Sequence, residues 1–461
     1  MMKISQPVAQ SAFALALLLL PLAAIPSASE AQAVPTAEVA PVSTGFALPS
    51  VAGSLQYALS ASESVSSDSY GTPGVVPSTY LTGDLAFITG SQRDPFSMVF
   101  SGGHSWANSY QPSFTFFNLA LSQTASVGRW AIVLADAVSY MPGTPSTGLS
   151  GIPGVGDLGA TPLPAGANPG ATGINPLPVP TSSGQGVLTG FSTQVDNTSS
   201  LSVQRQITGK TSLIASGSYF LMRFLGDTGG STASITPGLD SDGDAASLGL
   251  NHRIDARTSV GGNYAYTRNT YSGYDFGTPM PAFSTQTASL LYTYQFTRKL
   301  ATSLSAGPQW ISIATPGNTP SLSLFANLSG TYTGKFSNAS LVYTRNANSG
   351  YGVVDGSISS SVTFSATRSF DRVWLCAATA AYTQTTGLPS SISLPFSFHT
   401  TVAGAQVTRA IARSFSAFAS YTVQNQSNQG AQAAVDLYSG LTQVAGFGIT
   451  YSPAAVRIGH P

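Results

Sequence analysis

The stretch from Phe283 to Trp310 constrains the fold more than any other part of the chain. It has two halves, separated by Thr297–Lys299, and apolar and polar side chains alternate along each half. Large apolar residues such as Leu290 and Tyr292 share one parity, and small polar residues such as Ser289 share the other. A period of two is that of a β-strand, and about ten residues is the length of a tilted membrane-spanning strand. The pattern predicts a hairpin of a transmembrane barrel, apolar toward lipid and polar toward the lumen.

The composition agrees with a membrane barrel and excludes several other classes. Only 8% of the 461 residues are charged, whereas about 25% is usual in a soluble domain. Past the N-terminal region no apolar run approaches the ~20 residues that a spanning helix needs. A net charge of zero argues against nucleic acid as a partner. The single cysteine, Cys376, excludes an internal disulfide framework.

The N-terminus has the features of an export signal. Lys3 supplies a positive charge, Ala12–Leu20 is an apolar core, and Ala31–Ala33 is a small-x-small cleavage site. We therefore expect export to the periplasm and insertion into the bacterial outer membrane. The expected organisation is a signal peptide at 1–33, a flexible lead at 34–53, a barrel at 54–452 and a tail at 453–461.

The alternating pattern repeats through the remaining chain and predicts an all-β, antiparallel, up-and-down barrel of about 18 strands (16–18). Short connections alternate with long ones, which fits short periplasmic turns and long extracellular loops. Trp130 and Trp374 follow short turns, whereas Trp106 and Trp310 precede long connections, so two aromatic girdles are expected. A soluble β-sandwich, the competing fold, needs neither uniform strands nor aromatic residues at strand ends.

Two local features stand out within this pattern. Parity shifts between Phe116 and Phe117, which suggests a β-bulge. The longest connection, Pro142 to Gly186, is rich in Gly and Pro and contains a single charge, Asp157. A connection of this length is usually functional or disordered, so it either folds inward and narrows the pore or remains a surface loop.

Four short motifs lie along the chain: Ser-Gly-Ile-Pro-Gly-Val-Gly-Asp at Ser150–Asp157, Gln-Arg-Gln-Ile-Thr-Gly-Lys at Gln204–Lys210, Ser-Ala-Gly-Pro-Gln-Trp at Ser305–Trp310 and Phe-Gly-Ile-Thr-Tyr-Ser-Pro at Phe447–Pro453. On these motifs the chain resembles a family of uncharacterised, porin-like outer-membrane β-barrel proteins. The resemblance implies the fold, the outer-membrane location and the barrel assembly machinery as a partner. It implies little about the substrate.

The polar parity of the strands supplies candidate pore-lining residues: Asp84, Thr287, Ser289, Thr293, Gln295, Ser303, Ser305, Gln309 and His399. This wall is nearly neutral, whereas strong ion selectivity usually requires rings of like charge. We therefore expect a porin-like channel for passive diffusion of small, mostly uncharged polar solutes. The alternatives are a non-conducting structural or surface-binding barrel, and an exopolysaccharide export barrel.

Arginines and aspartates near the long connections suggest two further sites. Arg223, Arg268 and Arg345 are in phase with outward-facing residues, so they could bind phosphates of lipopolysaccharide, unless a bulge turns them inward. The spacing of three aspartates resembles the start of a calcium loop; they are Asp240, Asp242 and Asp244. Position twelve is Asn251 rather than the glutamate that closes such a loop. A solvated extracellular loop is the plainer interpretation, and no cofactor is expected.

Enzyme chemistry is not indicated. Nucleophilic hydrolysis needs a nucleophile, a histidine base and an orienting group held together. The histidines, His104, His252, His399 and His460, are scattered, and no Gly-x-Ser-x-Gly motif occurs.

Overall fold

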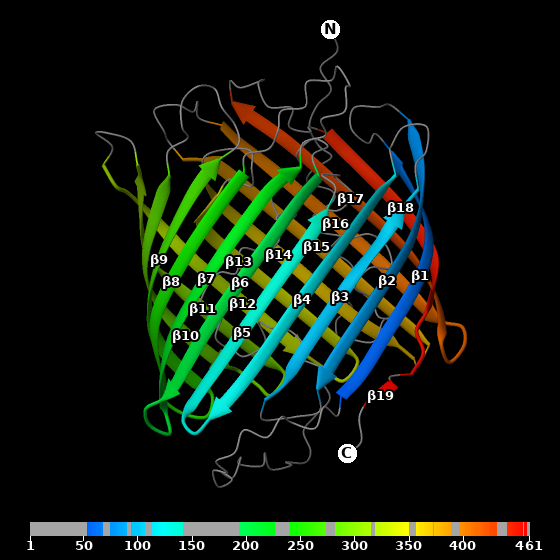
Figure 1. Cartoon of the computed structure of the whole chain (residues 1–461). Coiled ribbons are helices and arrows are strands. Elements are labelled where there is room, and N and C mark those ends of the chain that lie inside the picture. Colours follow the sequence, from blue (N-terminus) through cyan, green and yellow to red (C-terminus); the bar gives the residue numbers. More distant parts are fainter. Residues whose placement is uncertain are drawn as a thin grey trace. The chain divides into compact units, whose positions relative to one another are not determined.

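The computed structural model describes residues 53–67, 74–89, 94–106, 113–141, 193–225, 240–272, 282–314, 319–349, 356–371, 373–388, 396–430, 440–454 and 456–458. Within these ranges the regular elements are all β-strands (Figure 1). No helix in this part of the chain is long and apolar enough to cross a membrane. The strands are β1 (Gly53–Ser67), β2 (Val75–Thr89), β3 (Phe96–Ser105), β4 (Phe114–Val127), β5 (Trp130–Met141), β6 (Thr193–Gln206), β7 (Thr211–Leu225), β8 (Asp240–Arg253), β9 (Thr258–Ser272), β10 (Phe283–Gln295), β11 (Leu300–Ile313), β12 (Ser321–Thr333), β13 (Ser337–Asn348), β14 (Ser357–Phe370), β15 (Trp374–Gly387), β16 (Phe396–Ala410), β17 (Phe415–Gly430), β18 (Gly440–Tyr451) and β19 (Val456–Ile458).

The sheet closes on itself. Each strand from β1 to β18 pairs antiparallel with its neighbour in sequence, and β1 also pairs with β18 through nine residues. The result is a closed, antiparallel 18-strand barrel, as the alternating pattern predicts, and not two packed sheets. One detail differs from expectation, because Val456–Ile458 of the expected tail forms β19 and pairs with Gly53–Leu55 of β1.

The connections between strands separate the barrel into two ends. At one end, here called the turn end, most strands are joined by two to four residues, for example Gly128–Arg129 between β4 and β5. At the other, the loop end, the connections are longer, and the one between β5 and β6 is residues 142–192. Short and long connections alternate along the chain, which confirms the sequence prediction.

Side chains of the turns bond to their own backbone. Asp255, between β8 and β9, accepts hydrogen bonds from the backbone N–H groups of Arg257 at 2.6 Å and Thr258 at 2.8 Å. These bonds to the ionised form hold the pKa of the Asp255 carboxyl below its usual value. The loop of four residues is thereby tied into one conformation.

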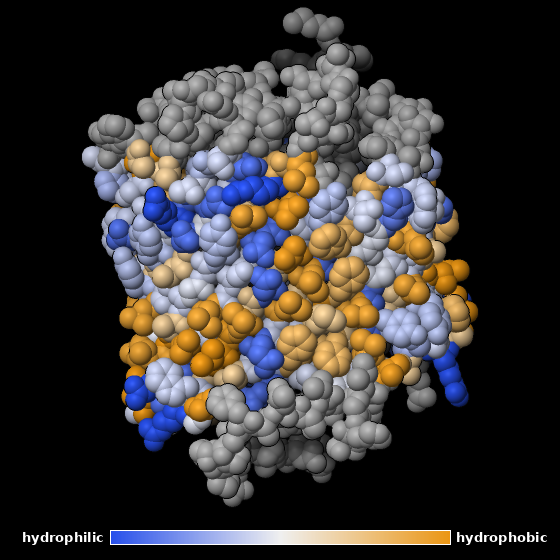
Figure 2. Space-filling view, viewed as in Figure 1, coloured by the Kyte–Doolittle hydropathy of each residue, from blue (hydrophilic) through white to orange (hydrophobic). Residues whose placement is uncertain are grey.

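The outer surface carries an apolar belt between two aromatic rims. Leu290 is 76% exposed and Leu322 is 69% exposed, which a water-soluble surface rarely shows repeatedly. Trp130 and Trp374 are exposed at the turn end. In Figure 2, hydrophobic side chains (orange) occupy much of this face, and strongly hydrophilic ones (blue) gather toward the loop ends of β7 and β8. This is the exterior of a membrane-spanning barrel.

Candidate functional site: the inner face and mouth of the barrel

Strand alternation places small polar side chains on the inner face. In β10, Thr285, Thr287 and Ser289 are each at most 6% exposed, and they alternate with outward-facing Leu290 and its neighbours. Many of these hydroxyls are paired across strands. The inner-face pairs include Ser60–Thr450 at 2.8 Å, Ser216–Ser247 at 2.7 Å, Ser303–Ser329 at 2.7 Å, Ser340–Ser365 at 2.7 Å and Ser359–Thr385 at 2.9 Å. The inner wall is therefore polar, sparsely charged and largely satisfied by its own hydrogen bonds.

Charge is sparse on this wall. Among the residues of β1–β18 that the structure describes, the charged side chains of inward parity are Asp84, Asp196 and Arg253. Asp84 and Asp196 are buried, and Asp196 accepts hydrogen bonds from Ser139 and Gln194, both at 3.2 Å. Arg253 is exposed at the turn end. These residues do not form a ring of like charge.

The sequence-derived pore-lining candidates divide into two groups. Eight have inward parity in the structure: Asp84, Thr287, Ser289, Thr293, Gln295, Ser303, Ser305 and Gln309. Within this group Gln309 donates to the Thr287 hydroxyl at 3.2 Å, so two neighbouring strands are linked on the inner face.

His399 does not lie where the sequence predicts. Its neighbours Phe398 and Thr400 are buried on the inner face of β16, so His399 has outward parity. Its Nδ1 hydrogen-bonds with the hydroxyl of Tyr382 at 2.9 Å, and the Tyr382 side chain is exposed on the outer face. The prediction of a lumenal His399 is wrong, because the large apolar residue of this segment faces inward and the polar one outward.

The alternating pattern also fails to identify aromatic side chains on the inner face, because it assigns large apolar residues to the outer face. Phe116 is 2% exposed and packs with Tyr80 inside the barrel, whereas Phe117 faces outward and stacks on Tyr140 with ring centroids 5.6 Å apart. The register of β4 with β3 is continuous through both phenylalanines, and pairing of β4 with β5 begins at Phe117 without a break. The predicted β-bulge is therefore wrong, and the change of parity marks an inward-facing aromatic residue.

The barrel wall parts between β12 and β13 near the loop end. Pairing between these strands stops at Ala326 and Arg345. Beyond that point Ser321–Phe325 of β12 pairs with β11 alone, and Asn346–Asn348 of β13 pairs with β14 alone. The upper part of β13 has therefore left the plane of the wall.

The displaced part of β13 and β14 turns into the barrel. The backbone N–H of Ala347 donates to Gln309 Oε1 at 3.1 Å, and the hydroxyl of Tyr271 donates to the carbonyl oxygen of Ser349 at 3.2 Å. Gln309 and Tyr271 have inward parity on β11 and β9, so the segment that they hold lies inside the wall. We call this segment the inward tip, and it comprises Asn346–Ser349 and Gly356–Ile358.

An apolar cluster fixes the inward tip against β10 and β11. Phe283 and Ile311 are each 1% exposed, and Leu388, which follows β15, is 3% exposed. Ala347 and Ile358 of the inward tip pack against them. We call this group the mouth cluster. Burying three large apolar side chains contributes on the order of 5–9 kcal/mol, so the tip is firmly held.

Gly356 is required at the base of the inward tip. Its φ is +113°, a region that residues with a side chain rarely adopt. A Cβ there would lie 2.8 Å from Leu388 Cδ1 and 3.1 Å from Phe283 Cε1. Its carbonyl oxygen also accepts the N–H of Leu388 at 3.1 Å. The absence of a side chain thus allows β14 to approach the mouth cluster closely.

The acidic segment of β8 belongs to the outer face, not to a loop. Asp240, Asp242 and Asp244 alternate with inward-facing Ser241 along the strand. Successive outward residues of an extended strand lie about 7 Å apart, which is too far for one ion to be shared in the way a calcium loop requires. Among the described residues no group of His, Cys, Asp or Glu is arranged to hold a metal.

Asp242 instead holds one of the three outer-face arginines. Arg223 donates to both carboxylate oxygens of Asp242, at 2.7 and 2.9 Å, and lies 3.9 Å from Asp240. Arg268 is exposed on β9 and paired in register with Asp244, and Arg345 donates to the Ser360 hydroxyl at 2.8 Å. All three have outward parity, but the guanidinium of Arg223 is already bound.

The connection at Pro142 to Gly186 lies outside the described residues, as do the signal peptide and most of the lead. The inward tip is the feature that the structure itself places at the mouth.

No protein-family model and no curated protein matches the chain. Among solved structures, OccK2 (OpdF) from Pseudomonas aeruginosa in complex with glucuronate is similar at 8% identity and a TM-score of 0.42, over 87% of this chain and 98% of that one. The FrpB iron transporter from Neisseria meningitidis is similar at 6% identity and a TM-score of 0.40, over 87% of this chain and 81% of that one. The siderophore receptor PiuA from Acinetobacter baumannii is similar at 10% identity and a TM-score of 0.36, over 86% of this chain and 82% of that one. Similarities of this degree establish neither a common family nor a common function.

Proposed function

We propose that this chain is a porin-like channel of the bacterial outer membrane, through which small, mostly uncharged polar solutes diffuse passively. The observation that carries the proposal is the sparsely charged, hydroxyl-rich inner face of a closed 18-strand barrel. Barrels of 16 to 18 strands enclose an aqueous lumen, whereas smaller ones are filled by side chains. Hydroxyl groups exchange hydrogen bonds with water and with sugar-like solutes without a charge to attract or repel ions.

The inward tip supports a size limit at the mouth. It occupies lumen space at the loop end, and the mouth cluster and the bonds from Gln309 and Tyr271 keep it there. Solutes would therefore pass between this segment and the facing wall. In this proposal the tip sets the size cutoff, and the paired hydroxyls of the wall set the preference for neutral polar solutes.

Single-channel recording of the refolded protein in a planar bilayer tests the proposal. We expect stepwise conductance and weak preference between cations and anions, because the described strands place no ring of like charge on the inner wall. A series of neutral polymers of increasing size should show a defined exclusion limit. Silent bilayers with protein that migrates as a folded barrel would contradict a channel and favour a structural or surface-binding barrel. Passage of very large polymers would favour polysaccharide export.

The outer-face arginines lead to a proposal about lipopolysaccharide. Arg268 and Arg345 remain the candidates for its phosphates, because Arg223 is bound to Asp242. We expect Arg268→Gln with Arg345→Gln to weaken lipopolysaccharide binding on the order of 100-fold, since each of two lost hydrogen bonds to a charged group contributes at least ~1.5 kcal/mol. Native mass spectrometry of the variants with added lipopolysaccharide measures this. The matched control is Arg223→Gln, and an equal loss in that variant would contradict the assignment.

A further inference from the structure

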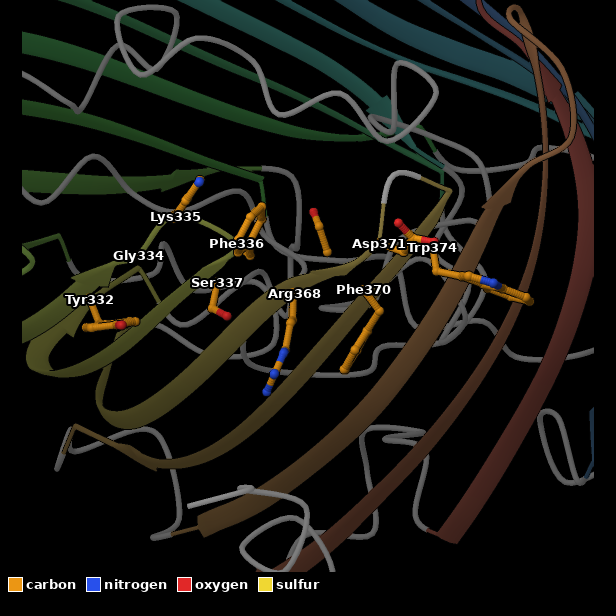
Figure 3. A pocket seen from close by; sticks show the side chains of 10 residues that line it. Tyr332, Gly334, Lys335, Phe336, Ser337, Arg368, Phe370, Asp371 and Trp374 are labelled. Carbon is orange, nitrogen blue, oxygen red and sulfur yellow. The ribbon is translucent and has the colours of Figure 1, made fainter. Parts of the chain in front are cut away.

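A cavity of about 460 Å³ opens on the outer face at the turn end of β12–β15 (Figure 3). Its walls are the turn between β12 and β13 and the turn between β14 and β15. Phe370 and Trp374 are partners in register and therefore face the same side, as are Ser337 and Arg368. Phe370 and Trp374 are 46% and 40% exposed. We call this cavity the turn-end pocket.

Cations are concentrated around the turn-end pocket. Arg368 lies over the ring of Phe370 at 4.7 Å, and Figure 3 shows the two side chains pointing the same way. Lys335 lies over Phe336 at 5.1 Å, and Arg409 of β16 lies over Trp374 at 5.1 Å. Among the described residues the ion pairs within 4 Å are those of Arg223, so none of these three cations is neutralised in that way. Among the described residues that line the pocket, Asp371 supplies the one carboxylate.

The position of the pocket limits what can fill it. Exposed rings of Tyr332, Phe336 and Phe370 lie where the apolar belt ends and water begins. A free anion would use the guanidinium alone and leave these rings in water. A purely apolar molecule would leave the cations without a partner. An amphiphile with an anionic head and acyl chains satisfies both, because a guanidinium binds phosphate oxygens bidentately and the rings pack beside the chains.

We propose that the turn-end pocket binds the headgroup of an anionic phospholipid. Arg368 binds the phosphate, and Arg409 and Lys335 supply a positive field around it. Tyr332 and Trp374 contact the part of the acyl chains nearest the headgroup. The volume is in the range of pockets that hold small ligands. This inference requires the barrel to reside in a membrane, but it does not depend on whether the barrel conducts.

Native mass spectrometry of the full chain in detergent, with phosphatidylglycerol and phosphatidylcholine of identical acyl chains, tests this. We expect one phosphatidylglycerol to remain bound in preference to phosphatidylcholine. Arg368→Gln should weaken that binding about tenfold, because charge-assisted bonds to phosphate are lost. The matched control is Arg205→Gln, since Arg205 lies over Trp130 at the same 5.1 Å as Arg409 over Trp374 but does not line this pocket.

Three outcomes would overturn the inference. Equal binding of the two lipids by the unmodified protein would exclude recognition of an anionic head. A loss in Arg205→Gln as large as that in Arg368→Gln would show a diffuse effect of charge. Displacement of the lipid by millimolar inorganic phosphate would show that an anion alone is bound. Arg368→Lys keeps the charge but not the planar guanidinium. This conservative variant distinguishes lost binding from lost folding, and it should retain part of the preference for phosphatidylglycerol.

Discussion

The double variant Phe283→Ala with Leu388→Ala should open the mouth of the barrel. These two side chains are buried in the mouth cluster and hold the inward tip. Truncating a buried phenylalanine to alanine costs about 3–5 kcal/mol, and about 3 kcal/mol changes the ratio of docked to undocked tip on the order of 100-fold. Single-channel recording should therefore show larger openings that are rare in the unmodified protein, together with a higher size limit for neutral polymers.

Phe398→Ala is the matched control for this experiment. Phe398 is 0% exposed on the inner face of β16 but does not belong to the mouth cluster. Its removal should leave the pattern of openings unchanged, although it also truncates a buried inner-face phenylalanine at a cost of about 3–5 kcal/mol. If both variants open the pore alike, general loosening is the cause and not release of the inward tip. Unchanged conductance in a folded double variant would show that the tip does not limit passage.

The parts of the fold that could be predicted from sequence are those with local causes. Alternation along Phe283 to Trp310 sets the parity of β10 and β11, because one face of each strand meets an apolar environment and the other meets polar neighbours. Charged residues such as Lys299 mark the turns, since a charge is costly in hydrocarbon. Closure follows from the same pattern, because an open sheet edge would leave backbone groups unpaired in lipid.

The parts that could not be predicted depend on contacts between distant residues. The rule that large apolar side chains face lipid fails at Phe116 and Phe398, where the interior is packed, and His399 is misplaced as a result. Asp240 and its neighbours have the composition of a loop, but pairing of Asp242 with Arg223 keeps them in a strand. The composition of such a segment does not show which residue of a neighbouring strand will pair with it.

The inward tip is the clearest case of a tertiary cause. Nothing in β12 or β13 alone predicts that they separate at Ala326 and Arg345. The separation is stabilised by Gln309, which accepts the N–H of Ala347 that would otherwise face a missing strand. Gln309 was a pore-lining candidate only because of its parity. In the structure its side-chain amide accepts the backbone N–H of Ala347, a group on the edge of β13 that no longer pairs with β12.

Gly307→Ala should destabilise the barrel by about 3 kcal/mol, because it forces overpacking against the backbone. Gly307 lies in β11 beside Ala288 of β10, and a Cβ there would overlap the Ala288 carbonyl oxygen and lie 2.8 Å from Ser289 Cα. Both obstacles are main chain in a paired strand, so no side-chain rotation relieves them. The following residue, Pro308, has no N–H to donate. The cross-strand approach here thus depends on an absent side chain.

Urea unfolding in detergent micelles, followed by tryptophan fluorescence, measures this effect. Gly330→Ala is the matched control, because a Cβ on Gly330 would meet only Thr302 Cγ2, at an ordinary 3.9 Å. That control should shift stability by no more than about 0.5 kcal/mol. Both glycines lie inside barrel strands. Replacing either one with alanine therefore lowers the conformational entropy of the unfolded chain by a similar amount. The difference between the two variants therefore isolates the overlap with β10, and equal unfolding midpoints would show that β10 and β11 can move apart at little cost.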